Sequence, residues 1–223
     1  MIPIRDINPT QKKPFVNIAL IVLNVLAFLY EVSLGSRVEG VFFLYGVVPA
    51  DAILAFSTYQ YIDGAIPFLT SMFLHGGWLH LAGNMLYLWI FGDNIEEKLG
   101  HARYLGFYVI CGLVAGALHV FVDPASTIPT VGASGAISGV LGAYLLMFPR
   151  ARVLTVIPIF FFIQLAELPA LFVLGFWFVI QFFNGLVSLG FETGGMGGVA
   201  WWAHIGGFLA GMALVAPFRK GAS

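Results

Sequence analysis

Long apolar runs separated by short polar segments dominate the chain. A helix needs about 20 predominantly apolar residues to cross a bilayer. The ~10-residue alternating segments of a membrane β-barrel are absent from the sequence. The pattern therefore predicts an all-α polytopic membrane protein, a single domain over residues 1–223. Its six predicted transmembrane helices lie at about residues 14–34, 78–93, 103–122, 134–148, 169–190 and 200–217.

Two further apolar regions do not fit a simple span. Residues 35–77 contain apolar pieces interrupted by Gly, Pro and Asp, and we predict a long first loop, partly embedded in the membrane interface. Residues 153–168 are apolar but include Pro158, Gln164 and Glu167. We predict an interfacial or partly buried connector there, with a seventh span as the alternative.

The composition agrees with a membrane location. The chain is 60% hydrophobic and only 9% charged, whereas soluble domains carry about 25% charged residues. The net charge of −1 gives no polybasic attraction to nucleic acid. Cys111 is the single cysteine, so an intrachain disulfide is impossible.

The basic residues predict the orientation. With six spans, all of the ten lysines and arginines except Arg37 fall on one side, which the positive-inside rule makes cytoplasmic. A seventh span within 153–168 would place Arg219 and Lys220 outside, which argues against it. We therefore expect an integral, multi-pass membrane protein with both termini cytoplasmic. A prokaryotic plasma membrane is the expected location. The residues on the cytoplasmic side are Arg5, Lys12, Lys13, Lys98, Arg103, Arg150, Arg152, Arg219 and Lys220.

Polar side chains recur at the starts of the three spans that begin at the outer face. Ionisable groups in a membrane are costly and are functional candidates by default. His80 and Asn84 are four residues apart and share one helix face, and His75 precedes them. Ser134 opens the fourth span and His204 lies near the start of the sixth. These groups are therefore expected in one layer near the outer surface.

Glycine spacing predicts which of these groups meet. Small residues four apart let two membrane helices approach closely. The fourth span has Gly135 and Gly139, and the sixth has Gly207 and Gly211. If these faces pack, the residues that open the two spans lie within about one helical turn, roughly 5 Å along the axis.

A serine hydroxyl beside a neutral imidazole is the minimum apparatus for nucleophilic catalysis. His80, Asn84 and the first N–H groups of the fourth span can then donate hydrogen bonds to an oxyanion. Ser134 is favoured over Ser138 as nucleophile because it lies nearer to water, while Ser138 can satisfy its hydroxyl on the Ser134 carbonyl.

Other interpretations of these residues stay open. Serine–glycine pairs often serve packing alone, and His80 with Asn84 can form an interhelical hydrogen bond. A transporter or channel could use His80, Asn84 and His204 as a polar pathway. The inner halves of the three spans are nearly all apolar, which argues against such a pathway.

Several motifs together resemble the rhomboid family of intramembrane serine proteases, over about residues 14–217. Gly132-Ala133-Ser134-Gly135 matches the family's GxSG nucleophile motif. Ala203-His204-Ile205-Gly206-Gly207, followed by Gly211, resembles the catalytic histidine and GxxxG stretch of the last core span. His75, His80 and Asn84 match the spaced His, His and Asn of the second span, and residues 92–100 resemble the acidic cytoplasmic loop after it.

The resemblance implies a six-helix core and a serine endopeptidase that cleaves membrane proteins in or near their transmembrane segments. It implies Ser134 as nucleophile and His204 as general base, without a metal or cofactor. It also implies an oxyanion site of His80, Asn84 and the Ser134 backbone N–H. The supporting residues would be His75, Gly132, Gly135, Gly207 and Gly211. A non-proteolytic rhomboid-like protein that binds transmembrane helices is the alternative within the family.

Two positions depart from the family pattern. Ile66-Pro67 stands where many members have a Trp-Arg pair in the first loop. Ser138 stands where some members have an aromatic residue packed on the catalytic histidine, which leaves open what holds His204. Trp201, Trp202 or a residue of another span are the candidates. The Gly-rich residues 191–202 are predicted to form a mobile lid.

Overall fold

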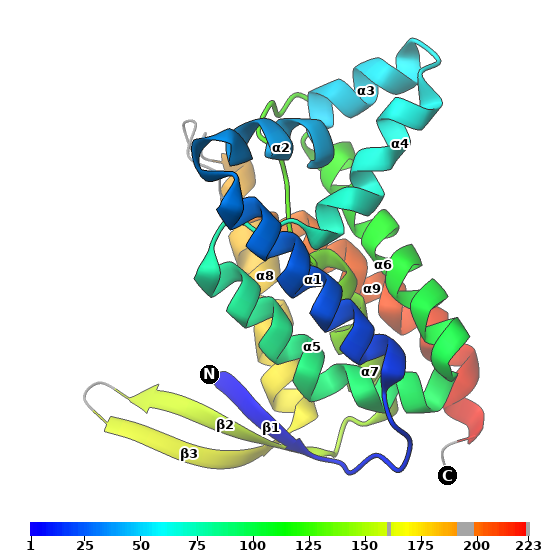
Figure 1. Cartoon of the computed structure of the whole chain (residues 1–223). Coiled ribbons are helices and arrows are strands. Elements are labelled where there is room, and N and C mark those ends of the chain that lie inside the picture. The colour runs from blue at the N-terminus through cyan, green and yellow to red at the C-terminus, as the bar shows by residue number, and fades with distance from the viewer. Residues whose placement is uncertain (160–161, 191–198, 222–223) are drawn as a thin grey trace.

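The computed structural model describes residues 1–159, 162–190 and 199–221, and the chain is mainly helical (Figure 1). The predicted long helices are all found, five with ends within two residues of the expected ones and one clearly longer than expected. The helix predicted at 78–93 continues to Leu99, so residues 92–99, expected as an acidic loop, are helical. The long helices are α1 (Phe15–Ser33), α5 (Trp78–Leu99), α6 (His101–Val122), α7 (Ser134–Met147), α8 (Ala170–Gly190) and α9 (Trp201–Val215).

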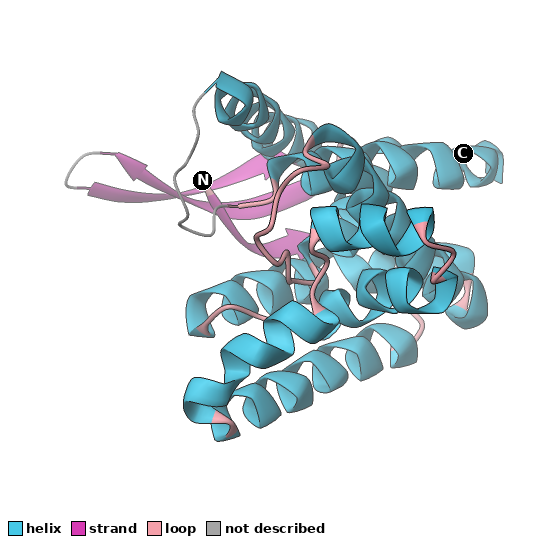
Figure 2. Ribbon diagram, turned by 90° about the horizontal axis from the view of Figure 1, so that it is seen from above, coloured by secondary structure: helices cyan, strands magenta, loops and turns pink. Residues whose placement is uncertain are grey.

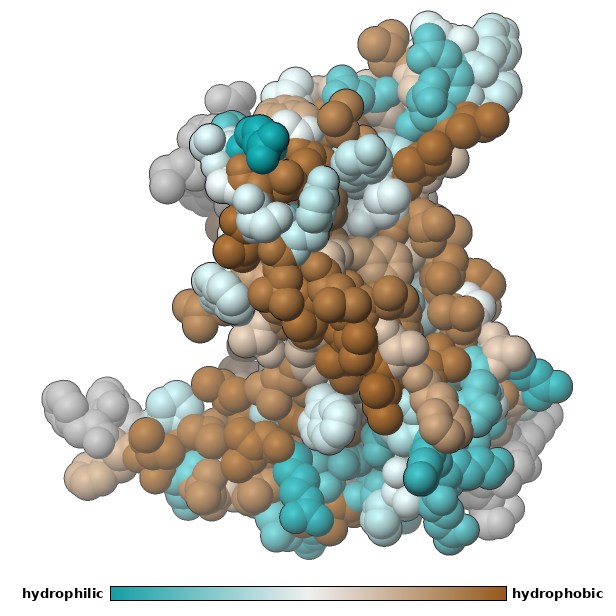
Figure 3. All heavy atoms as spheres, viewed as in Figure 1, coloured by the Kyte–Doolittle hydropathy of each residue, from teal (hydrophilic) through white to brown (hydrophobic). Residues whose placement is uncertain are grey.

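Among the described residues, four helices are long and apolar enough to cross a membrane: α1, α6, α8, and α9 with its continuation to Phe218. Helix α5 carries acidic residues in its last turns, and α7 has only 14 residues. Apolar side chains cover the middle of one face of the molecule and part of the projecting region at lower left, while hydrophilic ones gather towards the two ends of the bundle (Figure 3). This distribution suits a bilayer around the middle of the bundle.

The segment 35–77 is not the loop that the sequence predicts, because most of it is helical. Each apolar piece is too short to span a bilayer, and Gly46 and Pro49 mark one of the breaks between pieces. Helices α2 to α4 lie together at one end of the bundle (Figure 1). The segment comprises η1 (Gly35–Arg37), α2 (Val38–Tyr45), α3 (Pro49–Ser57), α4 (Tyr61–Thr70) and η2 (Ser71–Phe73).

The all-α prediction is wrong at the other end of the molecule. There β1 (Ile2–Ile7), β2 (Arg152–Ile159) and β3 (Phe162–Pro169) form an antiparallel sheet in the order β1-β2-β3. Strand β2 is rich in Val, Ile and Thr, which favour strands. The sheet extends beyond the helices on one side (Figure 2). The connector between α7 and α8 is therefore a β-hairpin, joined by the N-terminal strand.

Side-chain hydrogen bonds fasten β1 and the segment after it to the helices. The Tyr144 hydroxyl of α7 donates to the Asp6 carboxyl at 2.7 Å, and the Thr10 hydroxyl donates to Asp93 of α5 at 3.1 Å. Burial raises the pKa of Asp6 to about 6. Asn8 bonds Asn94 in the same region. These contacts tie the sheet to the ends of α5 and α7.

Helix α7 lies at the centre of the bundle and touches α9 through backbone atoms. Residues Gly135 to Tyr144 of α7 are all buried. A Cβ atom at Gly207 would overlap the Gly135 carbonyl oxygen, and one at Gly211 would overlap the Gly139 carbonyl oxygen. The predicted close packing of these two glycine pairs is confirmed.

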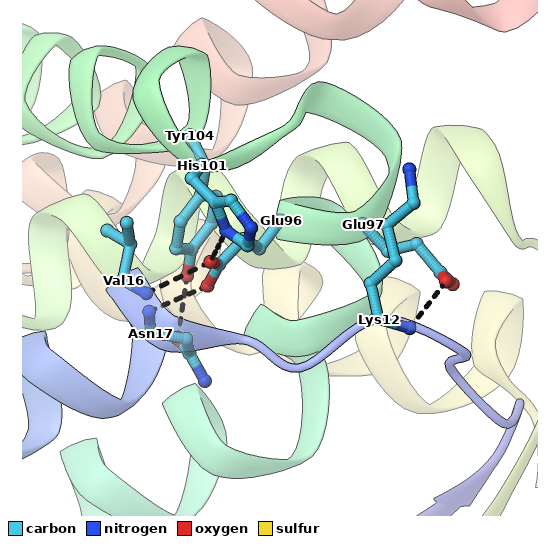
Figure 4. A network of polar contacts seen from close by, with 7 residues as sticks. All are labelled: Lys12, Val16, Asn17, Glu96, Glu97, His101 and Tyr104. Carbon is cyan, nitrogen blue, oxygen red and sulfur yellow. Dashed lines mark hydrogen bonds and ion pairs between the residues drawn. The ribbon is translucent and has the colours of Figure 1, made fainter.

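Glu96 of α5 caps the start of α1 from a neighbouring helix (Figure 4). Its buried carboxylate accepts hydrogen bonds from the backbone N–H groups of Val16 at 2.9 Å and Asn17 at 2.7 Å. His101 bonds the same carboxylate at 2.5 Å, and the Tyr104 hydroxyl donates to the Asn17 side chain at 2.8 Å. The first N–H groups of a helix have no partner within it, so this carboxylate replaces a local cap.

Replacing Glu96 with alanine is expected to destabilise the fold. The change leaves buried N–H groups of α1 without an acceptor, at a cost of about 3 kcal/mol. Thermal unfolding in detergent measures the effect, with Glu39→Ala, at an exposed position of α2, as the matched control. Equal unfolding temperatures for the two variants would show that Glu96 does not anchor α1.

Candidate active site

A cavity of about 1310 Å³ opens where the N-terminal ends of α5, α7 and α9 meet. Four of the polar residues predicted for the site line it: His80, Asn84, Ser134 and His204. The four polar groups predicted to lie in one layer therefore share one cavity. His75, expected in the same layer, is not among the residues that line the cavity.

Ser134 and His204 are within hydrogen-bond distance. Ser134 is the first residue of α7, His204 is the fourth residue of α9, and their Oγ and Nε2 atoms are 2.8 Å apart. The glycine contacts between α7 and α9 start one residue after Ser134 and hold the two helix backbones together. The juxtaposition predicted from the glycine spacing is confirmed.

The structure distinguishes the two neighbouring serines. The Ser138 hydroxyl donates to the Ser134 backbone carbonyl at 2.6 Å, as expected for a serine one turn into a helix. Ser138 is 1% exposed, whereas Ser134 is partly exposed in the cavity. Of these two serines, only Ser134 has its hydroxyl paired with an imidazole.

His80 presents a hydrogen-bond donor beside Ser134. The backbone N–H of Gly76 donates to His80 Nδ1 at 3.4 Å, so the neutral ring carries its proton on Nε2. A Cβ atom built on Gly132 would lie 2.7 Å from His80 Nε2 and 3.5 Å from Ser134 Oγ. Gly132 also has φ +133°, a conformation that favours glycine. Both observations explain why glycine stands two residues before Ser134.

Asn84 supplies a second donor at the cavity. It lies four residues after His80 on α5, and its side chain is 7% exposed. Its Nδ2 is buried and has no hydrogen-bond partner among the described residues. A buried polar group without a partner is costly, so this N–H is a candidate donor to a group bound in the cavity.

Hydrogen bonds from three other elements hold the segment before Ser134. The Gly132 N–H donates to the Ser71 carbonyl at 2.9 Å, and Thr130 pairs with Val47 through both backbone groups. The Thr130 hydroxyl also bonds His119 of α6 at 2.9 Å. These hydrogen bonds constrain the backbone just before Ser134.

His75 lies behind His80, outside the cavity. It is 1% exposed, and its ring packs edge-on against the His80 ring, with the centroids 5.1 Å apart. Burial, and then the neighbouring His80, lower the pKa of His75 to about 4, so the ring is neutral at pH 7. The backbone N–H of His75 donates to the Glu31 carboxylate of α1 at 3.2 Å. Sequence reasoning missed Glu31, although an acidic residue within an apolar run is a visible signal.

Three side chains surround the His204 ring. Trp201, named as a candidate from the sequence, packs edge-on with the ring centroids 6.3 Å apart. Trp177 of α8 packs at a tilt of 35° with the centroids 5.8 Å apart. Gln181, also of α8, brings its Oε1 within 2.7 Å of His204 Nδ1. Sequence reasoning missed Gln181, a polar residue in an otherwise apolar span. Residues 191–198 of the predicted lid lie outside the described residues.

The fold and the site define the class of this protein: it is a mainly helical membrane bundle in which a serine and a histidine side chain pair at one cavity. Residues 63–221 match the family model of the Rhomboid domain, which covers more than half of the chain. The chain therefore belongs to the rhomboid family, and it is an integral membrane protein.

Curated relatives agree with this membership. The chain is 36% identical over 100 residues to "Rhomboid protein 1, mitochondrial" of Saccharomyces cerevisiae, covering 43% of this chain and 29% of that protein. It is 46% identical over 77 residues to "Rhomboid protease GluP" of Bacillus subtilis, covering 34% and 15%. It is 38% identical over 79 residues to "Putative rhomboid protease YdcA" of the same organism, covering 35% and 39%. The chain thus spans well under half the length of these relatives.

Proposed function

We propose that this protein is an intramembrane serine endopeptidase that hydrolyses peptide bonds in or near the transmembrane segments of other membrane proteins. The observation that carries the proposal is the 2.8 Å contact between Ser134 Oγ and His204 Nε2 inside the cavity. One of the similar bacterial proteins is named "Rhomboid protease GluP", which supports the same activity. No metal or cofactor enters the proposed reaction.

In the proposed mechanism His204 Nε2 takes the proton of the Ser134 hydroxyl as the oxygen attacks a peptide carbonyl. The protonated imidazole then gives that proton to the leaving amine. Water, activated by the same imidazole, hydrolyses the acyl-enzyme and restores the serine.

We propose that the tetrahedral oxyanion is bound by donors of three residues that line the cavity. These are Asn84 Nδ2, His80 Nε2–H and the backbone N–H of Ser134 at the start of α7. A preorganised donor of this kind is worth roughly 3–4 kcal/mol in the best-studied case. The orphaned donor of Asn84 thereby gains a partner in the transition state.

The proposed topology has six spans and places Ser134 below the outer membrane surface. Helix α7 has 14 residues, or about 21 Å of helix, which is shorter than the ~30 Å hydrocarbon core. The cavity then admits water from the outer side, while the termini and the sheet lie on the cytoplasmic side. A helical substrate hides its carbonyls in hydrogen bonds, so cleavage is expected near the outer end of a substrate span, where small residues allow unwinding.

Labelling with a serine-reactive fluorophosphonate tests the proposal without knowledge of the substrate. The wild-type protein in detergent is expected to form a single adduct, located on Ser134 by mass spectrometry of its peptides. Ser134→Ala should lose the adduct, and Ser138→Ala should keep it because that hydroxyl is bonded to a backbone carbonyl. A folded wild-type protein without an adduct on Ser134 would favour a non-proteolytic, helix-binding rhomboid protein.

A further inference from the structure

We infer that Gln181 of α8 is a positioning residue that fixes the tautomer and orientation of His204. The inference rests on the proposed function and adds a third member to the Ser134–His204 pair. It also answers which residue holds the imidazole when the position one turn after Ser134 is the small Ser138 rather than an aromatic residue.

The orientation of the Gln181 amide follows from its two hydrogen bonds. Its Nε2 lies 3.4 Å from the backbone carbonyl of Trp177, which can only accept a hydrogen bond. The amide nitrogen therefore faces Trp177, and the amide oxygen faces His204 Nδ1 at 2.7 Å. Gln181 is 6% exposed, so the buried amide keeps both contacts without competition from water.

This orientation dictates where the proton of His204 lies. An amide oxygen only accepts, so His204 Nδ1 carries the hydrogen and Nε2 keeps its lone pair. That lone pair faces Ser134 Oγ at 2.8 Å, as a general base requires. The opposite tautomer would present an N–H to the serine, which cannot take its proton. The hydrogen bond at one ring nitrogen thus sets the role of the other.

Helix α8 contributes a second constraint from the same face. Trp177 and Gln181 are four residues apart, so they lie one above the other on the helix. Trp177 packs on the imidazole ring while Gln181 binds its edge. One contact limits tilting of the ring and the other limits its rotation. The position of α8 is therefore expected to control the orientation of the His204 imidazole, in addition to enclosing one side of the site.

The role of Gln181 is tested by the kinetics with which the protein cleaves a single-span reporter in detergent. Gln181→Met keeps the length of the side chain but removes the acceptor for Nδ1–H. We expect kcat to fall about 10- to 100-fold with KM nearly unchanged, a smaller loss than the ~10⁴-fold caused by misorienting the base of a serine protease triad. Gln164→Met, on exposed strand β3, is the matched control and should leave both constants unchanged.

A second variant separates positioning from simple packing. Gln181→Glu retains an acceptor oxygen for Nδ1–H and adds a charge that favours the protonated imidazole. We expect the acidic limb of its pH–activity profile to move to higher pH, with activity recovered above that limb. An unchanged profile in Gln181→Glu, or full kcat in Gln181→Met, would overturn the inference while leaving the protease proposal intact.

Nuclear magnetic resonance of the histidine rings tests the inference even if no reporter is cleaved. With ¹⁵N-labelled histidine, the ring signals of His204 are those lost in His204→Ala. The wild-type protein should show the proton on Nδ1, and Gln181→Met should show a mixture of both tautomers. A wild-type ring protonated on Nε2 would refute the role of Gln181. Failure of Ser134 to label with fluorophosphonate, in contrast, would refute the proposed function.

Discussion

Replacing either Ser134 or His204 with alanine is expected to abolish cleavage of a single-span reporter, with a loss of kcat of about 10⁴-fold or more. The two side chains act as one unit, because the hydroxyl is a poor nucleophile until an imidazole removes its proton. Their 2.8 Å contact provides that path for the proton. The measurement is initial-rate cleavage in detergent or liposomes, with circular dichroism and thermal unfolding as checks of the fold.

The double variant Ser134→Ala/His204→Ala should be no less active than either single variant, because residues of one catalytic unit are not additive. Ser138→Ala is the matched control, since it removes a hydroxyl one turn away that is already bonded to the Ser134 carbonyl. We expect it to keep most of the wild-type activity. Activity that survives Ser134→Ala would disprove the assignment of the nucleophile.

The long helices could be predicted because each follows from a local pattern of apolar residues and breakers. Their starts at Trp78, Ser134 and Trp201 lie within a residue of the predicted ones. The sheet could not be predicted this way, since β1 pairs with a strand some 150 residues away in sequence. Residues 153–168 carry too few polar residues to show strand alternation, and the N-terminal segment is too short to reveal a partner.

The contact between Ser134 and His204 could be predicted because the spacing of the glycines indicates which faces of α7 and α9 pack closely. The groups that position them could not, because they depend on the rotation of neighbouring helices. Gln181 stands in an apolar span with nothing in the sequence to say that it faces His204. The family resemblance puts Glu96 in an acidic loop, whereas its buried carboxylate caps α1. In each case the polar residue was visible and its partner was not.

Adding a single methyl group at Gly211 is expected to damage both stability and activity. A Cβ atom there would overlap the carbonyl oxygen of Gly139, and it would also come within 2.5 and 2.6 Å of the Gly139 carbonyl carbon and Cα. These are backbone atoms, so no side-chain rotation relieves the overlap. Helices α7 and α9 must move apart, at a cost of about 1–3 kcal/mol or more for overpacking.

The matched control is Gly106→Ala in α6, where a Cβ atom would meet nothing within 4 Å. Alanine favours a helix over glycine by about 1 kcal/mol, so this variant should be as stable as the wild type or more so. Thermal unfolding in detergent compares the two variants. If Gly211→Ala unfolds at the wild-type temperature, the α7–α9 backbone contact does not hold the bundle together.

The same displacement should also lower the rate of cleavage, because Ser134 and His204 lie on the two helices that separate. A misplacement of about 1 Å can cost 10²-fold in rate. We therefore expect Gly211→Ala to lose about 10²-fold in reporter cleavage at temperatures where it is still folded, although position 211 lies two helical turns from His204 and does not line the cavity. Fluorophosphonate labelling of Ser134 should slow in parallel. A folded Gly211→Ala variant with normal cleavage would contradict this expectation. It would mean that α8 and the segment before α7 set the contact between Ser134 and His204 at the cavity, and that the glycine contacts between α7 and α9 do not.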